Sequence, residues 1–276
     1  MSILYVVPTP IGNMSDVSER MRRTFEEVDF VAAEDTRIGG KLLTLLGIKK
    51  SLLPYHEHNK KQCGEEILSR LKDGRTCALI TDAGTPAVSD PGEDLVRLCH
   101  ENGVTVVPIA GPCAAVTAIS ASGIPCRRFC FEGFLPENKN ERASYLASLA
   151  KEVRCMVFYS PPHDLKKILT CLLEAFGDRR ATLCKELTKI NEKITYSTLS
   201  ALSAEADAAQ SIKGEYVIVV EGYVATESDM FWHDMTVEEH VEHYISLGLS
   251  KMDAMKAVSS DRGVGKGEIY KIINAK

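Results

Sequence analysis

Short apolar runs alternate with amphipathic segments along the first half of the chain. The β-prone runs are Leu4–Val7, Phe30–Ala33, Leu52–Tyr55, Thr76–Thr81 and Thr105–Ile109. Segments with helical spacing lie between and after them, from Asn13, Ser15 or Asp16 to about Glu27, then at Lys41–Leu46, Cys63–Lys72, Glu93–Asn102 and Cys113–Ser120. Short strands that alternate with helices predict a mostly parallel sheet covered on both faces.

The second half repeats this alternation after a loop that carries Pro136, Asn138 and Asn140. Its predicted strands are Phe129–Phe131, Met156–Tyr159, Ala181–Leu187, Lys193–Leu199 and Tyr216–Val220, with a helix at Leu165–Phe176. Three short helices are predicted at Val237–Leu247, Lys251–Val258 and Gly267–Asn274, like a small helix-turn-helix. We therefore expect an α/β protein with domains 1–126 and 127–222, followed by a linker and helical appendage at 223–276.

Composition narrows the class of protein. The 276 residues carry a formal charge of −5, which disfavours a protein that grips nucleic acid with its whole surface but leaves room for a local basic patch. The N-terminal apolar run is too short for a signal peptide, and no later run is long enough to span a membrane. The nine cysteines form no CxxC pair, so we expect reduced, mostly buried thiols, no metal site and a cytoplasmic location.

Three polar loops directly follow predicted strands, where open α/β sheets bind ligands. In the first, Pro8–Asn13, two prolines and Gly12 set a tight turn. The second, Thr81–Gly92, packs two aspartates, two glycines and two prolines into twelve residues, so its backbone can wrap around a polar small molecule. The third, Gly111–Ala115, has small residues that leave space for a flat group such as adenine. Together the loops predict a small-molecule site.

These loops also carry a family resemblance. The segments LYVVPTPIGN, VAAEDTR, HEHN, ALITDAGTPAVSDPG, VVPIAGPCAAVTAIS and FEGFLP resemble, in this order, the tetrapyrrole-methylase family, and within it the members that methylate the ribose 2'-hydroxyl of cytidine 1402 in 16S ribosomal RNA. The resemblance covers about residues 3–222 and is looser over the final helices. It implies the two-domain tetrapyrrole-methylase fold (class III methyltransferase), S-adenosylmethionine in the cleft between the domains, a homodimer, and 16S rRNA or the assembled 30S subunit as partner.

The resemblance further implies which residues hold the cofactor. From the first domain these are Pro8, Pro10, Gly12, Asp82, Ala83, Gly84, Thr85, Pro86, Ser89, Pro112, Cys113 and Ala114. From the second domain, residues expected to close over the adenosine are Phe158, Tyr159, Ser160, Glu186, Leu187, Gly214 and Glu215.

Methyl transfer to a ribose hydroxyl needs in-line positioning and removal of a proton. We assign proton handling to Asp35 or His56, and phosphate or base contacts to Arg37 and Asn59. Each has a structural alternative: Asp35 can cap a helix, and His56 can simply belong to a turn. The pair Lys185-Glu186 is a second possibility for the proton.

Two other functions remain open from the sequence. One keeps the fold and cofactor but methylates a small molecule such as a corrinoid precursor, which suits the acidic charge. The other is a non-catalytic regulator that binds nucleic acid through its C-terminal helices, which leaves the three loops unexplained. If RNA is the acceptor, the basic doublets Arg22-Arg23, Lys60-Lys61 and Arg127-Arg128 and the last helices are candidate contacts.

Overall fold

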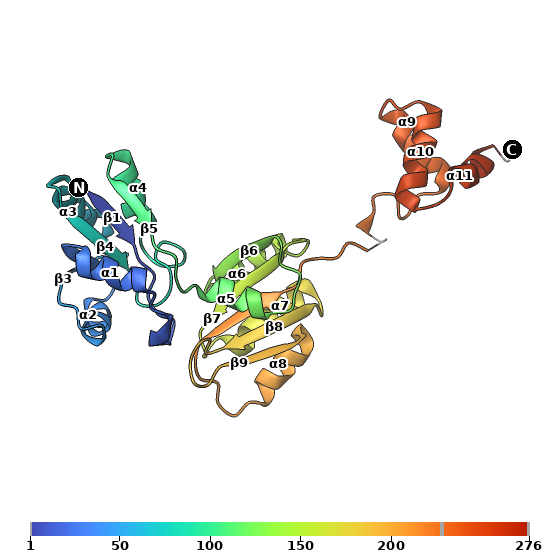
Figure 1. Ribbon diagram of the computed structural model, residues 1–276. Coiled ribbons are helices and arrows are strands. Elements are labelled where there is room, and N and C mark those ends of the chain that lie inside the picture. The colour runs from blue at the N-terminus through green and yellow to red at the C-terminus, as the bar shows by residue number, and fades with distance from the viewer. Residues whose placement is uncertain (1, 227–228, 275–276) are drawn as a thin grey trace. The chain divides into compact units, whose positions relative to one another are not determined.

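The computed structural model describes residues 2–226 and 229–274. The chain divides into two compact units, Met1–Tyr223 and Val224–Lys276. The first unit contains two five-stranded sheets, and the second is helical (Figure 1). Every helix found in the described residues is too short or too polar to cross a membrane.

The first sheet is entirely parallel, with strand order β3-β2-β4-β1-β5. Its strands are β1 Ile3–Val6, β2 Phe30–Ala33, β3 Ser51–Pro54, β4 Thr76–Ile80 and β5 Thr105–Pro108. Its helices are α1 Glu19–Glu27, α2 Thr36–Leu45, α3 Lys60–Lys72 and α4 Glu93–Glu101. Two apolar clusters form its core, so the sheet is covered on both faces as the strand pattern predicts. All five strands end at one edge, where the three polar loops begin.

Two helix starts differ from the prediction. Asn13 caps only a short 3-10 helix, η1 Met14–Asp16. Helix α1 begins at Glu19, and Ser18 is its N-cap. Helix α2 begins at Thr36, five residues before the predicted start at Lys41. The sequence pattern does not predict this first turn, because the two glycines before Lys41 lower the helix propensity of the segment. Gly39 packs closely on the sheet, since an added Cβ would lie 3.0 Å from Ile80 Cδ1 and 3.1 Å from Ala33 Cβ, so a neighbouring side chain would have to shift.

The second sheet is mixed, with order β6-β7-β10-β8-β9. Only its pair β6-β7 is parallel, and the other three pairs are antiparallel. Its strands are β6 Phe129–Phe134, β7 Cys155–Ser160, β8 Arg180–Lys185, β9 Lys193–Thr198 and β10 Tyr216–Val220. Its helices are α6 Lys139–Ser148, α7 Leu165–Phe176 and α8 Leu199–Ala208, and they help bury one face of the sheet.

Two of these helices are missing from the prediction. Helix α6 lies where a loop is predicted, and Asn138 caps its first turn by accepting from the backbone N–H groups of Asn140 and Glu141. Helix α8 follows strand β9 without a loop, with Thr198 as its cap. Both helices bury few large apolar side chains, so their sequences carry little helical periodicity.

The other face of the second sheet is covered by α5 Ala114–Ala121, which comes from the first half of the chain. Ala115 and Ala118 of this helix are buried with Val157 and Val219 in one cluster. The helix therefore joins the two halves, because its first turn begins at the edge of the first sheet while its body packs on the second.

The expectation that all cysteines are reduced is wrong at one pair. Cys126 and Cys155 form a disulfide, with their Cα atoms 5.6 Å apart. The link after α5 brings Cys126 beside the first residue of β7, a proximity that sequence spacing cannot reveal. The other seven cysteines are free thiols.

The C-terminal unit is a bundle of α9 Val237–Ser246, α10 Lys251–Arg262 and α11 Lys266–Ile273. Its small core is built from Val241, Ala254, Val258 and Ile269. The α10 helix ends at Arg262 and is capped by Gly263, whose φ of 63° is the left-handed conformation common after helices. The three helices agree with the prediction to within a few residues.

Candidate functional site

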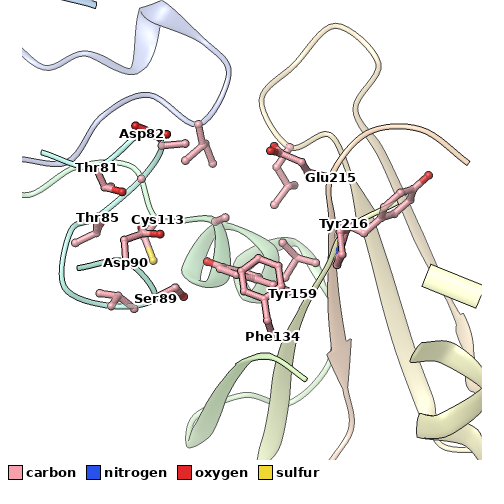
Figure 2. Close-up of a pocket in the computed structure, with 18 of the residues that line it drawn as sticks. Thr81, Asp82, Thr85, Ser89, Asp90, Cys113, Phe134, Tyr159, Glu215 and Tyr216 are labelled. Atoms are coloured by element: carbon pink, nitrogen blue, oxygen red, sulfur yellow. The ribbon is translucent and has the colours of Figure 1, made fainter. Parts of the chain in front are cut away.

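A pocket of about 440 Å³ lies between the edge of the first sheet and the second sheet (Figure 2). Its lining residues come from the loops after β1, β2 and β4, from the start of α5, and from β6, β7, β8 and β10. They are Ile11, Glu34, Thr81, Asp82, Ala83, Gly84, Thr85, Val88, Ser89, Asp90, Cys113, Ala114, Phe134, Tyr159, Ser160, Pro161, Pro162, Cys184, Leu187, Glu215, Tyr216 and Val217.

Hydrogen bonds tie the three predicted loops together on the first wall of this pocket. Thr9 and Gly84 exchange backbone hydrogen bonds of 2.8 and 3.1 Å, and the Thr9 hydroxyl donates to the Thr81 carbonyl at 3.1 Å. The Thr85 hydroxyl donates to the Pro112 carbonyl at 2.9 Å, which joins the second loop to the third. Gly84 has a φ of 87°, which favours glycine, and this turn brings the backbone to the pocket surface.

The first wall is acidic. The Thr81 hydroxyl donates to Glu34 Oε2 at 2.6 Å, and Asp82 Oδ1 accepts from the backbone N–H of Asp35 at 3.2 Å. Burial raises the pKa of Asp90, and the charges of Glu34 and Asp82 raise it further. Burial and the Glu34 charge likewise raise the pKa of Asp82. Clustered carboxylates of this kind favour a cationic ligand, which would relieve their mutual repulsion.

The second wall is apolar and aromatic. The Tyr159 hydroxyl accepts from the backbone N–H of Ala115 at 3.1 Å, so strand β7 is held to the start of α5. Burial raises the pKa of Tyr159 to about 12, so the phenol stays neutral. The rings of Phe131 and Phe134 meet Tyr159 edge-on, with centroids 5.0 and 5.4 Å away. This wall suits a flat ring, and Figure 2 shows Tyr159 and Phe134 facing the acidic wall.

A loop of the second half also approaches the first wall. Lys189 Nζ lies 2.8 Å from carboxylate oxygens of both Glu186 and Glu215. A Cβ on Gly12 would lie 2.3 Å from Lys189 Cγ, so the lysine stem occupies the space beside this glycine. Glu186 and Thr188 have positive φ values of 50° and 66°, and this strain shapes the loop over the pocket margin.

Many residues expected to hold the cofactor line this pocket. They are Asp82, Ala83, Gly84, Thr85, Ser89, Cys113, Ala114, Tyr159, Ser160, Leu187 and Glu215. Pro10 and Gly12 line a smaller, second pocket instead. The remainder line neither pocket: Pro8, Pro86, Pro112, Phe158, Glu186 and Gly214. Phe158 is fully buried in the core on the opposite face of β7 from Tyr159, as neighbouring strand residues must be.

Several lining residues escaped the sequence prediction. They include Glu34, Asp90, Phe134, Pro161, Cys184 and Val217. Asp90 could have been found, because it lies in the same dense loop as Gly84 and Ser89. Phe134, Cys184 and Val217 carry no local signal, since apolar strand residues are usually core.

The residues expected to handle the proton and RNA line neither pocket. Asp35 caps α2 by accepting from the Arg37 backbone N–H at 2.8 Å, and the Arg37 guanidinium lowers the pKa of Asp35 to about 2. Asn59 Oδ1 accepts from the His56 backbone N–H at 2.8 Å, and Asn59 donates to the Pro54 carbonyl, which closes a turn. These contacts match the structural alternatives, and the catalytic assignments stay predictions.

The basic doublets differ in whether they form ion pairs. Arg22 pairs with Glu26, Arg23 with Glu19, and Lys60 with both Glu57 and Asp94. Arg127 and Arg128 are exposed and form no ion pair within the described parts of the chain. No group of three or more His, Cys, Asp or Glu side chains among residues 2–226 and 229–274 is arranged to hold a metal.

The chain is similar in sequence or in fold to proteins of one methyltransferase family. The family model of tetrapyrrole (corrin/porphyrin) methylases matches residues 3–203. The solved structure of uroporphyrin-III-C-methyltransferase from Thermus thermophilus is similar, with a TM-score of 0.58 and 19% identity, over 80% of this chain and 94% of that one. A cobalt precorrin-4 methyltransferase has the same TM-score at 15% identity, over 80% and 95% of the two chains. These two likenesses show the fold.

Curated relatives are much nearer in sequence. A protein of Halalkalibacterium halodurans named ribosomal RNA small subunit methyltransferase I is 44% identical, over 98% of this chain and 93% of its own. Proteins of the same name from Bacillus subtilis and Escherichia coli O157:H7 are 43% and 44% identical, over 98% and 97% of this chain and 93% of each relative. The chain therefore belongs to the tetrapyrrole (corrin/porphyrin) methylase family, and within it to the group named ribosomal RNA small subunit methyltransferase I.

Proposed function

We propose that this methyltransferase moves a methyl group from S-adenosylmethionine to the 2'-hydroxyl of a cytidine ribose in 16S ribosomal RNA. The observation that carries the proposal is the pocket with one acidic and one aromatic wall, in a chain whose relatives are named as small-subunit rRNA methyltransferases. Its site of action would be the cytoplasm, where ribosomal RNA is found.

S-adenosylmethionine fits the residues that are present. The pocket volume of about 440 Å³ lies within the roughly 300–1,000 Å³ of small-molecule sites. The cofactor carries a sulfonium and an ammonium group that suit carboxylates such as Asp82 and Asp90, and an adenine that suits Tyr159 and Phe134. Bound there, it supplies an electrophilic methyl group.

The chain's own residues would contribute positioning and exclusion of water. The backbone around Gly84 and Thr85, with Ser89 nearby, would border the methionine and ribose portions. Tyr159, Ser160, Leu187 and Glu215 would enclose the adenosine from the second wall. Holding two reactants in line supplies on the order of 7–11 kcal/mol in favourable cases, so geometry accounts for much of the catalysis.

The RNA assignment rests on the relatives' names and on local charge. Net charge is −5, so contact with phosphates must be local, and the exposed Arg127 and Arg128 are available for it. A homodimer would present this doublet twice along a longer surface.

Two measurements test the proposal. Titration calorimetry with S-adenosylmethionine should show binding, and absence of binding would favour a regulator that is not an enzyme. Mass spectrometry of 16S rRNA from a deletion strain should show loss of one 2'-O-methylated cytidine, which returns on complementation. If every 2'-O-methylated cytidine persisted in the deletion strain, the RNA acceptor would be abandoned in favour of a small-molecule one.

A further inference from the structure

A second, smaller pocket adjoins the first. Its volume is about 200 Å³, and it is lined by the loop after β1, by helix α2 and by the first residues after β4. Thr81 and Asp82 line both pockets, so the two cavities meet at the end of strand β4. In Figure 2 these two residues lie side by side at the margin of the larger pocket.

The lining of the second pocket is mainly apolar. Pro10, Met14, Ile38, Leu42 and Leu45 contribute side chains. Leu45 is 61% exposed and Ile38 is 43% exposed, although both are large aliphatic residues. Aliphatic side chains exposed beside a cavity typically mark a surface that a ligand covers.

One cation stands beside these apolar side chains. Lys41 lines the pocket and is exposed, and its side-chain ammonium has no hydrogen bond or ion pair within the parts of the chain that the structure describes. The other cation on the first turns of α2, Arg37, is paired with Asp35. Lys41 is therefore available to an anionic group of a ligand, such as a phosphate.

The size of the pocket limits its occupant. A volume of about 200 Å³ is below the roughly 300–1,000 Å³ typical for a whole small-molecule ligand. A volume of this size suits one part of a ligand, such as a single ring with its attachment. Proteins that recognise RNA bind bases that are unstacked from their neighbours, and Lys or Arg side chains contact the phosphates.

From this we propose that the second pocket binds the acceptor nucleoside of an RNA chain and that Asp82, at its junction with the first pocket, takes the proton of the attacking 2'-hydroxyl. The inference rests on the proposed function and names its acceptor subsite. The base lies against Leu45 and Ile38, a neighbouring phosphate lies near Lys41, and the ribose is left at the junction.

The chemical step at the junction balances. The bond from the ribose oxygen to the methyl carbon forms as the bond from sulfur to that carbon breaks, and its electron pair stays on sulfur. The hydroxyl proton passes to the Asp82 carboxylate, so one negative and one positive charge are both neutralised. The hydrogen bond from the Asp35 backbone N–H holds one oxygen of Asp82 in place. The raised pKa of Asp82 makes it a better base than Asp35.

A matched pair of variants tests the subsite. Leu45→Glu places a charge in the second pocket, whereas Thr44→Glu places the same charge on the adjacent exposed residue, which lines neither pocket. The probe is the small ribosomal subunit from a deletion strain. Leu45→Glu removes an apolar contact with the base and adds a negative charge that repels the RNA phosphate. It should therefore slow single-turnover methylation about 10- to 100-fold. Thr44→Glu should change it less than about twofold, as expected of an independent site.

A readout independent of activity accompanies the rates. Dimethyl sulfate reacts with N3 of unpaired cytidines, so a base enclosed in the pocket is protected when the protein is bound to the subunit. Protection of the acceptor cytidine by the wild type and by Thr44→Glu, and its loss with Leu45→Glu, is the expected pattern. Equal protection by Leu45→Glu and the wild type would overturn the subsite.

Asp82→Asn tests the proton acceptor. At saturating S-adenosylmethionine the rate should fall about 100-fold or more, and the acidic limb of the pH–rate profile should disappear, with protection of the cytidine retained. An unchanged pH profile would overturn the role of Asp82. If the wild type itself transferred no methyl group to the subunit, the proposed function would fail; if it did so and Leu45→Glu matched it, only the subsite would fail.

Discussion

The two walls of the main pocket differ in chemistry and in how the chain builds them. The first wall comes from loops at one edge of a parallel sheet and carries Glu34, Asp82 and Asp90. The second wall comes mainly from strand faces of a mixed sheet and carries Phe134 and Tyr159. Loops can offer backbone groups and carboxylates, whereas strand faces offer side chains at fixed spacing. The first wall therefore offers charge, and the second offers flat apolar surface.

The largest effect is expected on the first wall. Gly84→Trp should weaken S-adenosylmethionine binding by about 100-fold or more, since a large ring enters the pocket and the turn has a positive φ. Gly103→Trp is the matched control, because Gly103 also has a positive φ of 69° but borders open space. Calorimetry at one temperature measures both variants. Equal affinities would remove the cofactor from this wall.

A smaller effect is expected on the second wall. Phe134→Ala should weaken cofactor binding by about 5- to 100-fold, which corresponds to the roughly 1–3 kcal/mol of one base–aromatic contact. Phe129→Ala, on the same strand, is the control, since Phe129 is also exposed but lines neither pocket. Adenosine alone should lose as much affinity as the whole cofactor. If adenosine affinity were unchanged, the aromatic wall would not hold the base.

The loop that joins the walls should give a modest effect. Lys189→Ala leaves Glu186 and Glu215 without the cation between them, and it removes the lysine stem beside Gly12. We expect cofactor affinity to fall about threefold, in line with a partly exposed ion pair. Lys193→Ala breaks an exposed pair with Glu205 elsewhere and should have no effect on affinity. A similar loss in both variants would point to net charge alone.

The smallest effect concerns stability and its pH dependence. Burial raises the folded-state pKa of Asp90 above its ordinary value of 3.8, so ionised Asp90 destabilises the fold near neutral pH. This destabilisation is absent below about pH 3.8, where Asp90 is protonated in both the folded and the unfolded state. It grows as pH rises and is complete above the folded-state pKa. Asp90→Asn should therefore raise the Tm at pH 7, and the gain should vanish at low pH. Thermal unfolding across this range measures it, and a Tm gain that does not change with pH would contradict the argument.

Much of the fold could be predicted from local pattern. The strands Phe30–Ala33 and Tyr216–Val220 and the helix Leu165–Phe176 match the structure residue for residue. Helices α6 and α8 were missed, because a helix that buries few large side chains leaves little periodicity to detect. The strand order and the mixed strand directions of the second sheet could not be predicted either, since strand partners are far apart in sequence.

The candidate site divides in the same way. The dense loop around Gly84 and Ser89 was identified because glycine, proline and aspartate at a strand end have conformational reasons to be there. Asp35 was assigned chemistry but caps a helix, and its neighbour Glu34 lines the pocket instead. Residue type at one position could not distinguish the two, because the direction of each side chain depends on the turn between β2 and α2.

The sequence by itself determined the alternation of strands and helices, the three loops at strand ends and the family. Only the tertiary structure decided that Phe134 faces Asp90 across a cavity, that Cys126 bonds to Cys155, and that Asp82 belongs to two pockets at once. The physical reason is the sequence separation over which each effect acts: periodicity and turn chemistry depend on residues only a few positions apart. The meeting of distant side chains depends on strand order and on how the two sheets approach each other.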